Sequence, residues 1–227
     1  MVSEPVTTVG LIGSGHIGYT VARLAVDAGH SVILSNSRGP DTLMELASDL
    51  GPRARAATSQ EAAADGEMAV VSVPVKAYAT LAGAPLAGKV VMDTGNYYPS
   101  RDGQIAELDA RTLTESEYLL RYLPGAEVVK VFNNIVFTHL LHLARPAGAA
   151  DRSALPIAGD NATAKAAVTE FLDSIGYGAV DAGPLVEGWR QQPGTPVYGT
   201  PYGSFDDELG TPAGADVIRA ALRAARR

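Results

Sequence analysis

The stretch of sequence that decides the fold reads Thr7-Thr8-Val9-Gly10-Leu11-Ile12-Gly13-Ser14-Gly15-His16-Ile17-Gly18. Its first half, residues 7–12, is a short apolar run typical of a buried β-strand. Its second half is a Gly-x-Gly-x-x-Gly pattern, and the apolar residues that follow recur at helical spacing up to Gly29. A strand, a glycine-rich turn and a helix in this order predict the first unit of a dinucleotide-binding parallel sheet.

The three glycines of this pattern have different expected roles. Gly13 permits the tight turn after the strand, Gly15 lets the backbone approach a pyrophosphate, and Gly18 allows close packing of helix on strand. The start of the helix adds free N–H groups and partial positive charge, which favour an anion. We therefore predict that a cofactor pyrophosphate is bound by Gly13, Ser14, Gly15, His16, Ile17 and Gly18. The alternative is a glycine-rich turn without a ligand.

The end of the second strand indicates which dinucleotide is bound. An NAD-binding protein places Asp or Glu about 20 residues after the glycines, where it accepts a hydrogen bond from the ribose 2′-hydroxyl. Here the chain reads Ser35-Asn36-Ser37-Arg38, with three hydrogen-bonding side chains and a guanidinium that binds a phosphate through two donors. The sequence therefore predicts NADP rather than NAD. The alternative for Arg38 is a surface charge before the Gly39-Pro40 turn.

Along the rest of the chain, short β-branched runs alternate with helical stretches. This alternation predicts an α/β fold of the Rossmann type, with a doubly wound parallel sheet of six strands in residues 1–148, the NADP-binding domain. The composition changes near Pro146, which predicts a small C-terminal α/β domain over residues 149–227. That domain is expected to contain strands at 155–158 and 179–181 and two helices. Between them lies a loop, 185–212, in which Gly, Pro and Tyr dominate and no period is visible.

Four helix starts carry capping signals. Asp41 is expected to cap the helix that ends at Gly51, and Thr58 with Glu61 has the spacing of a capping box. The same spacing recurs at Thr114 and Glu117, while Asp160 or Asn161 is expected to cap the first helix of the small domain.

Residues that follow the later strands are expected to line the nicotinamide pocket, because ligands of such sheets lie beyond the carboxyl ends of the strands. These residues are Ser72, Val73, Pro74, Asn96, Asn133 and Asn134. The alternative for the asparagines is turn chemistry, since Asn bonds its own backbone. The candidate proton donors are Lys76, Tyr78, Tyr97 and Tyr98. No spacing singles one of them out, so no catalytic residue is predicted.

Composition excludes several other classes of protein. The 18 Lys and Arg against 25 Asp and Glu give a net charge of -7, and the basic residues gather only at Arg219, Arg223, Arg226 and Arg227, so no nucleic-acid partner is expected. Without Cys there is no thiolate metal cluster, and His139 and His142 lack a helix-borne carboxylate motif, so no metal site is expected. We also expect no membrane span, no signal peptide and a soluble cytoplasmic protein.

Six motifs give the chain a resemblance to a known family, the NADP oxidoreductases that depend on the deazaflavin coenzyme F420. The motifs are Leu11 to Gly18, Ser37-Arg38, Ala69 to Pro74, Lys89 to Met92, Leu155 to Asp160 and Val180 to Leu185. The resemblance implies hydride transfer between NADPH and the deazaflavin in a cleft between the two domains. It also implies that Ser37 and Arg38 hold the 2′-phosphate, that Val73 and Pro74 lie along the nicotinamide, and that the protein is a homodimer.

The chain departs from this family after Leu185. In the deazaflavin-reducing enzymes this stretch looks like a hydrophobic helix at the second-cofactor site, whereas here it is a loop with Trp189, Tyr198 and Tyr202. Two further functions therefore remain open. One is an NADPH-dependent reductase of a small carbonyl, imine or metal chelate, and the other is a non-catalytic NADP-binding module.

Overall fold

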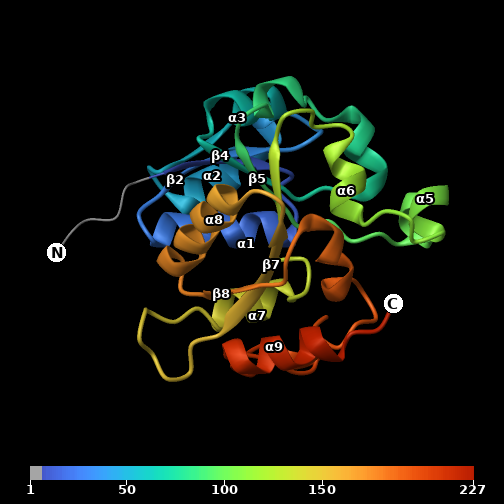
Figure 1. Ribbon diagram of the computed structural model, residues 1–227. Coiled ribbons are helices and arrows are strands. Elements are labelled where there is room, and N and C mark those ends of the chain that lie inside the picture. Colours follow the sequence, from blue (N-terminus) through green and yellow to red (C-terminus); the bar gives the residue numbers. More distant parts are fainter. Residues whose placement is uncertain (1–6) are drawn as a thin grey trace.

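An eight-stranded sheet forms the centre of the computed structural model, which describes residues 7–227 (Figure 1). The strands lie in the order β3-β2-β1-β4-β5-β6-β7-β8, and every neighbouring pair is parallel except β6 and β7. The strands are β1 (Thr8–Ile12), β2 (Ser31–Ser35), β3 (Ala54–Ala56), β4 (Met68–Val71), β5 (Val90–Asp93), β6 (Glu127–Lys130), β7 (Ala154–Gly159) and β8 (Gly178–Asp181). The predicted α/β fold with a doubly wound parallel sheet is confirmed.

Helices and short 3-10 helices connect these strands. The α-helices are α1 (His16–Asp27), α2 (Met44–Leu50), α3 (Ser59–Asp65), α4 (Pro99–Asp102), α5 (Ala106–Asp109), α6 (Glu115–Leu120), α7 (Phe137–His142), α8 (Ala162–Ser174) and α9 (Ala215–Ala224). The 3-10 helices are η1 (Pro40–Leu43), η2 (Val75–Thr80), η3 (Ala84–Leu86), η4 (Leu185–Gln191) and η5 (Thr200–Tyr202).

The capping predictions are confirmed in three cases out of four. Thr58 and Thr114 each form a capping box with the Glu three residues on, and Asn161 caps α8 by accepting from two backbone N–H groups. The prediction for Asp41 is wrong, because Asp41 lies inside η1 and α2 begins only at Met44 without a side-chain cap.

Both faces of the sheet are covered by helices, as the continuous apolar runs require. In β4 the side chains of Met68 and Val70 pack into a hydrophobic cluster with α1 and α8, whereas Ala69 and Val71 pack into a second cluster with α3 and α6. Figure 1 shows α3 and α1 on opposite sides of the strands. The sheet therefore has two buried faces, and its carboxyl edge is left for ligands.

The C-terminal unit continues the sheet of the first. Lys130 of β6 pairs with Ala158 of β7, and the apolar stripe of α8 lies in the same hydrophobic cluster as Val9 and Leu11 of β1. His30 joins the two parts as well, since its Nε2 lies 2.8 Å from Ser174 Oγ. The two expected strands and the helix between them are present, and the domain boundary at residue 148 stays a prediction.

Distant side chains fix the conformation of the segment from residue 185 to residue 212. Tyr202 is fully buried and its hydroxyl donates to Ala154 O over 2.8 Å, while Asn134 Nδ2 donates to Val197 O over 3.0 Å. The expected loop thus contains the short helices η4 and η5, which the hydrophobic periodicity of the sequence did not predict. The segment is therefore held in place by hydrogen bonds to Ala154 of β7 and to Asn134 in the turn after β6.

Candidate cofactor and substrate site

The glycine loop has the geometry that its pattern predicts. A Cβ atom at Gly13, where φ is +104°, would lie 2.2 Å from Ser72 O, and one at Gly18 would lie 2.2 Å from Gly13 O. A Cβ at Gly15 would meet no atom within 4 Å. Two glycines therefore let the turn, α1 and the β4 end pack closely, and the third leaves open space at the exposed start of α1. This space is where the predicted pyrophosphate fits.

The other loop residues hold the turn or border it. Ser14 Oγ donates to Ser35 O over 2.7 Å, and Gly13 N donates to the same oxygen over 3.1 Å. Ile17 packs against the core, and the exposed His16 ring stacks on Phe137 with a centroid distance of 4.4 Å. Ser14 and Ile17 thus shape the loop, and His16 borders the open side.

The four residues predicted to recognise the 2′-phosphate divide into two pairs. Ser35 is fully buried, and its Oγ donates to Leu11 O within the sheet. Its hydroxyl therefore does not face the cofactor side, and the prediction that Ser35 helps to recognise the 2′-phosphate is corrected. Asn36 accepts from Arg38 N over 2.8 Å and donates to Thr42, so it forms the turn. Ser37 and Arg38 are exposed, and within residues 7–227 the Arg38 guanidinium has no hydrogen-bond or ion-pair partner. These two side chains remain available to a phosphate.

The residues after β4, β5 and β6 meet at the carboxyl edge of the sheet. Ser72 and Val73 are half-buried and Pro74 is exposed, beside the Gly13 turn. Asn96 and Asn133 bond each other, since Asn96 Nδ2 donates to Asn133 O over 2.7 Å and Asn133 Nδ2 donates to Asn96 Oδ1 over 3.0 Å. The asparagines therefore form a side-chain pair at this edge.

Several buried amide groups beside this pair lack partners among the described residues. The unpaired atoms are Asn133 Oδ1, Asn134 Oδ1 and both amide atoms of the fully buried Gln191. Asn133 Nδ2 also donates to Gln191 O over 2.6 Å, so Gln191 belongs to the same polar region. Unpaired buried amides are costly, which makes this region suited to a polar ligand group or ordered water. Sequence reasoning missed Gln191, because one Gln in an irregular stretch carries no pattern.

The four candidate proton donors lie in different surroundings. Tyr78 is buried and donates to Asp93, and burial together with Asp93 raises its pKa well above the ordinary value. Burial and the hydrogen bond with Tyr198 raise the pKa of Tyr98. Tyr97 donates to Asp109, and Lys76 is exposed. The tyrosine hydroxyls therefore stay protonated at neutral pH, and none is distinguished as the proton donor.

A buried group of charges that sequence reasoning missed lies behind Asn96. Lys130 is fully buried, and its Nζ lies 3.5 Å from Asp93 Oδ2 and 3.8 Å from Glu115 Oε2. It also donates to Gly95 O, and Ser116 Oγ donates to Asp93 Oδ2 over 2.6 Å. This network fixes the turn after β5. The only signal in the sequence was a strand-end Lys, which resembles an ordinary surface charge.

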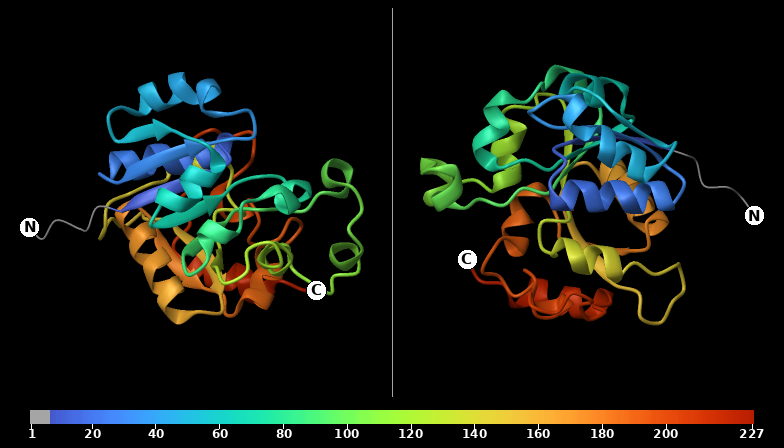
Figure 2. Two further views of the ribbon diagram at one scale, coloured as in Figure 1. Left: turned by 90° about the horizontal axis from the view of Figure 1, so that it is seen from above. Right: turned by 180° about the vertical axis from the view of Figure 1, so that it is seen from behind.

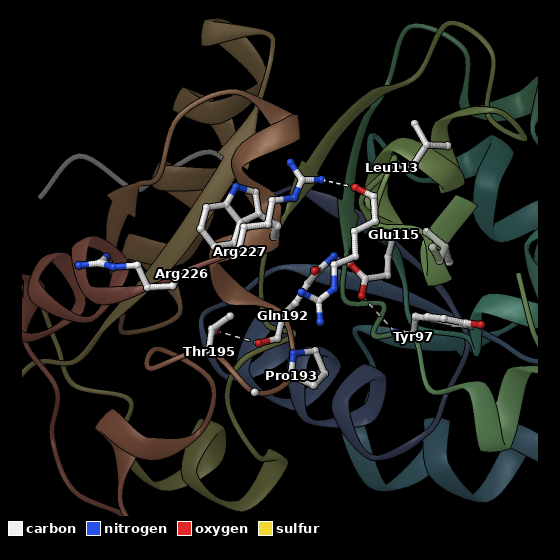
Figure 3. A pocket seen from close by; sticks show the side chains of 12 residues that line it. Tyr97, Leu113, Glu115, Gln192, Pro193, Thr195, Arg226 and Arg227 are labelled. Atoms are coloured by element: carbon white, nitrogen blue, oxygen red, sulfur yellow. Dashed lines mark hydrogen bonds between the residues drawn. The ribbon is translucent and has the colours of Figure 1, made fainter. Parts of the chain in front are cut away.

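A pocket of about 320 Å³ opens on the other side of Glu115. Segments 97–115 and 192–195 line it together with Trp189, Arg226 and Arg227 (Figure 3). The green segment around α5 and the red C-terminal residues lie side by side there in Figures 1 and 2, and Arg227 donates to Arg111 O over 2.5 Å. The pocket therefore joins residues of both halves of the chain.

Two further findings bear on other functions. Within residues 7–227 there is no group of three or more metal-ligating side chains, and His139 and His142 instead bond the carbonyl oxygens of Asp207 and Glu208. No helix in the described part of the chain has both the length and the apolar character needed to cross a membrane.

The parallel sheet and the glycine loop at the start of α1 define a dinucleotide-binding protein of the Rossmann type. Residues 8–97 match the model of a family described as NADP oxidoreductase, coenzyme F420-dependent. The match spans β1 to β5 and the glycine loop, so this part of the chain is similar to the NADP-dependent oxidoreductases of that family. The resemblance seen in the sequence motifs and the choice of NADP are thereby confirmed.

Relatives of the chain carry different names. It is 32% identical over 181 residues to Metalloreductase STEAP3 of Rattus norvegicus, with 78% of this chain and 34% of that protein covered, so it spans about a third of the rat protein. It is 28% identical to the F420-dependent NADP reductase of Methanothermobacter marburgensis, covering 76% and 82%. A crystal structure from Arthrobacter sp. FB24, provisionally named an F420-dependent NADP-reductase, has a TM-score of 0.66 at 25% identity, covering 80% and 86%.

Proposed function

We propose that this protein transfers a hydride between NADPH and a deazaflavin, coenzyme F420. The observation that carries the proposal is the family match of residues 8–97 over a glycine loop whose open side, at Gly15, can admit a pyrophosphate. The relative from Methanothermobacter marburgensis, which this chain spans over 82% of its length, is named for this activity.

The chain's own residues bind and orient the two partners. The free N–H groups at the start of α1 hold the pyrophosphate, and Ser37 with Arg38 holds the 2′-phosphate. Val73 and Pro74 would lie along the nicotinamide, on the side of the sheet edge where Asn96 and Asn133 pair. NADPH supplies the hydride when it is bound. Because the reacting atoms belong to the two ring systems, the protein has mainly to align the rings and exclude water, which suits a site without a distinguished acid.

The test is turnover with purified protein. NADPH and oxidised coenzyme F420 are mixed with the protein, and the visible absorbance of the deazaflavin is followed, with NADH and flavin mononucleotide (FMN) in parallel reactions. We expect loss of absorbance with NADPH and coenzyme F420 and slow or no loss with NADH. A protein that binds NADPH but does not reduce the deazaflavin would contradict this function.

A second candidate is reduction of a metal chelate by NADPH, favoured by the 32% identity to the rat metalloreductase over 78% of this chain. The chelate is a substrate here, so no resident metal ligands are needed. NADPH oxidation with a ferric chelate, measured with and without added FMN as an electron carrier, distinguishes this activity. No ferric reduction under either condition would remove this candidate.

The homodimer and the cytoplasmic location expected from the sequence belong to the same proposal. Light scattering coupled to size-exclusion chromatography measures the mass in solution. We expect twice the mass of one 23.5 kDa chain.

A further inference from the structure

The pocket beside Glu115 differs in charge from the chain as a whole. The chain has a net charge of -7, yet three arginines, Arg111, Arg226 and Arg227, are among the residues that line this pocket, with one acidic side chain, that of Glu115. The Arg226 guanidinium points away from the pocket (Figure 3). Two of these arginines, Arg226 and Arg227, belong to the C-terminal group of basic residues in the sequence. A local excess of guanidinium on an acidic protein attracts anions and favours their binding.

The carboxylate of Glu115 already has hydrogen-bond and ion-pair partners within the protein. Glu115 Oε1 accepts from Tyr97 N over 3.3 Å, and Oε2 accepts from the Gln192 amide and lies 3.8 Å from Lys130 Nζ. Its side chain is 5% exposed. Glu115 therefore belongs to the buried network with Lys130 and competes little with a ligand for the arginines.

The arginines, by contrast, keep unused donors. Arg227 gives one N–H group to Arg111 O and lies over the Trp189 ring at 6.0 Å from its centroid, and Arg226 gives one nitrogen to backbone carbonyls. In the described part of the chain the Arg111 guanidinium has no hydrogen-bond or ion-pair partner. A guanidinium offers five donors in a planar fork that matches carboxylate and phosphate oxygens.

The pocket also lies next to the edge where the nicotinamide is expected. Glu115 in its wall touches Lys130, and Lys130 donates to the carbonyl of Gly95, the residue before Asn96. Two residues of its lining, Tyr97 and Gln192, also directly follow Asn96 and Gln191, which belong to the polar region at that edge. At about 320 Å³ the pocket has the size of a small-molecule site.

We propose that this pocket binds the second substrate of the hydride transfer and that this substrate is an organic anion, whose carboxylate or phosphate pairs with Arg111 and Arg227. The inference rests on the proposed function, because it names the substrate class of that reaction. It does not depend on which anion is reduced in the cell.

Trp189 supplies a direct readout, because it is the only tryptophan in the sequence and lies in the pocket wall. The probes are FMN and riboflavin, which share one ring system and differ in a phosphate. Tryptophan fluorescence is titrated with each probe in the presence of saturating NADP⁺, and free N-acetyltryptophanamide corrects for flavin absorbance. We expect FMN to quench Trp189 with a Kd at least about tenfold lower than riboflavin, a difference of about 1.4 kcal/mol.

Two variants and a matched control assign the effect to the pocket. Arg111→Gln and Arg227→Gln should each weaken FMN binding about fivefold and leave riboflavin within about twofold. Arg219→Gln removes the same charge from an exposed pair with Asp216 outside this pocket and should change neither. The circular dichroism of all variants shows whether they fold.

Three results would overturn the inference. They are equal binding of FMN and riboflavin, equal effects of all three substitutions, or FMN binding that occurs only when NADP⁺ is left out, which would assign the pocket to the first cofactor. Absence of quenching by both probes also counts against it. Failure of the hydride-transfer assay is a separate outcome, because quenching that depends on Arg111 needs no turnover. In that case the anion site stands and the deazaflavin proposal falls.

Discussion

The glycine loop of residues 13–18 and the C-terminal segment of residues 185–212 are both irregular backbone, but they are held in opposite ways. The loop is fixed by backbone contacts within one βαβ unit, where Gly13 N donates to Ser35 O and a Cβ on Gly13 would meet Ser72 O. The segment is fixed by buried side chains, as when the Tyr202 hydroxyl donates to Ala154 O. Local geometry can be predicted from a short pattern, whereas contacts 48 residues apart cannot.

The largest expected effect comes from Gly13→Ala. The new Cβ would stand 2.2 Å from Ser72 O at a φ of +104°, so both strain and overlap with backbone oppose it. We expect the free energy of unfolding to fall by about 3 kcal/mol, measured by urea denaturation.

Gly15→Ala is the matched control within the same loop. Its φ is -73° and its Cβ would meet nothing within 4 Å, so stability should change by only about 0.5 kcal/mol. NADPH binding should nevertheless weaken about tenfold, because the methyl group occupies the space proposed for the pyrophosphate. If Gly13→Ala proved as stable as Gly15→Ala, the close packing of the loop would be refuted.

Arg38→Ala tests the end of β2, which belongs to the same locally encoded unit. NADPH binding should weaken by roughly 1.5 to 3 kcal/mol, the scale of a charged hydrogen bond, and NADH binding should barely change. Fluorescence titration with both cofactors measures the two affinities. Equal loss for NADPH and NADH would show that Arg38 does not recognise the 2′-phosphate.

Tyr202→Phe tests the C-terminal segment. The change removes the donor to Ala154 O and the acceptor at 3.3 Å from Asn134 Nδ2 in a fully buried place. We expect a loss of about 1 to 2 kcal/mol in urea denaturation, with NADPH affinity retained. Tyr198→Phe is the control, since its hydroxyl is only half-buried and bonds just Tyr98, and it should cost less than Tyr202→Phe.

The smallest effect concerns Asp102, which holds the turn beside Tyr98. Burial acts to raise the pKa of Asp102, but hydrogen bonds from Arg101 and from the backbone N–H groups of Tyr98 and Lys76 outweigh it and hold the pKa below 3.8. A lowered pKa adds stability above pH 3.8, and this is lost as the pH falls through the folded-state value. Asp102→Asn should therefore lower the melting temperature more at pH 7 than at an acid pH below 3.8. An equal effect at both pH values would contradict this.

Much of the fold follows from the sequence because its signals are local. The apolar runs, the capping boxes and the glycine pattern each extend over only a few residues. They correctly predicted the strands, several helix starts and the turn formed by the glycine loop. The antiparallel pairing of β6 with β7 depends on residues about 30 positions apart. The hydrophobic periodicity within either strand therefore does not reveal it.

The candidate site was predictable only in part for the same reason. Ser37 and Arg38 were predicted from their position after β2, and that prediction remains to be tested. The inward orientation of the Ser35 hydroxyl depends on its hydrogen bond to Leu11 O across the sheet. Lys130 and Glu115 become one network only when β6 and α6 come together. The pocket at Trp189 likewise needs the C-terminal arginines to fold back onto the segment around Arg111.

The shared core under α8 has a consequence for synthesis of the chain. Met92 and Val129 of the N-terminal half lie in one hydrophobic cluster with Val168 and Phe171 of α8. While the ribosome has made only the first 148 residues, α1 and α7 cover part of that side of the sheet, but the part that α8 will cover presents apolar surface to chaperones and to other nascent chains. A gene fragment that ends before α8 should yield aggregated protein even though it contains the whole glycine loop.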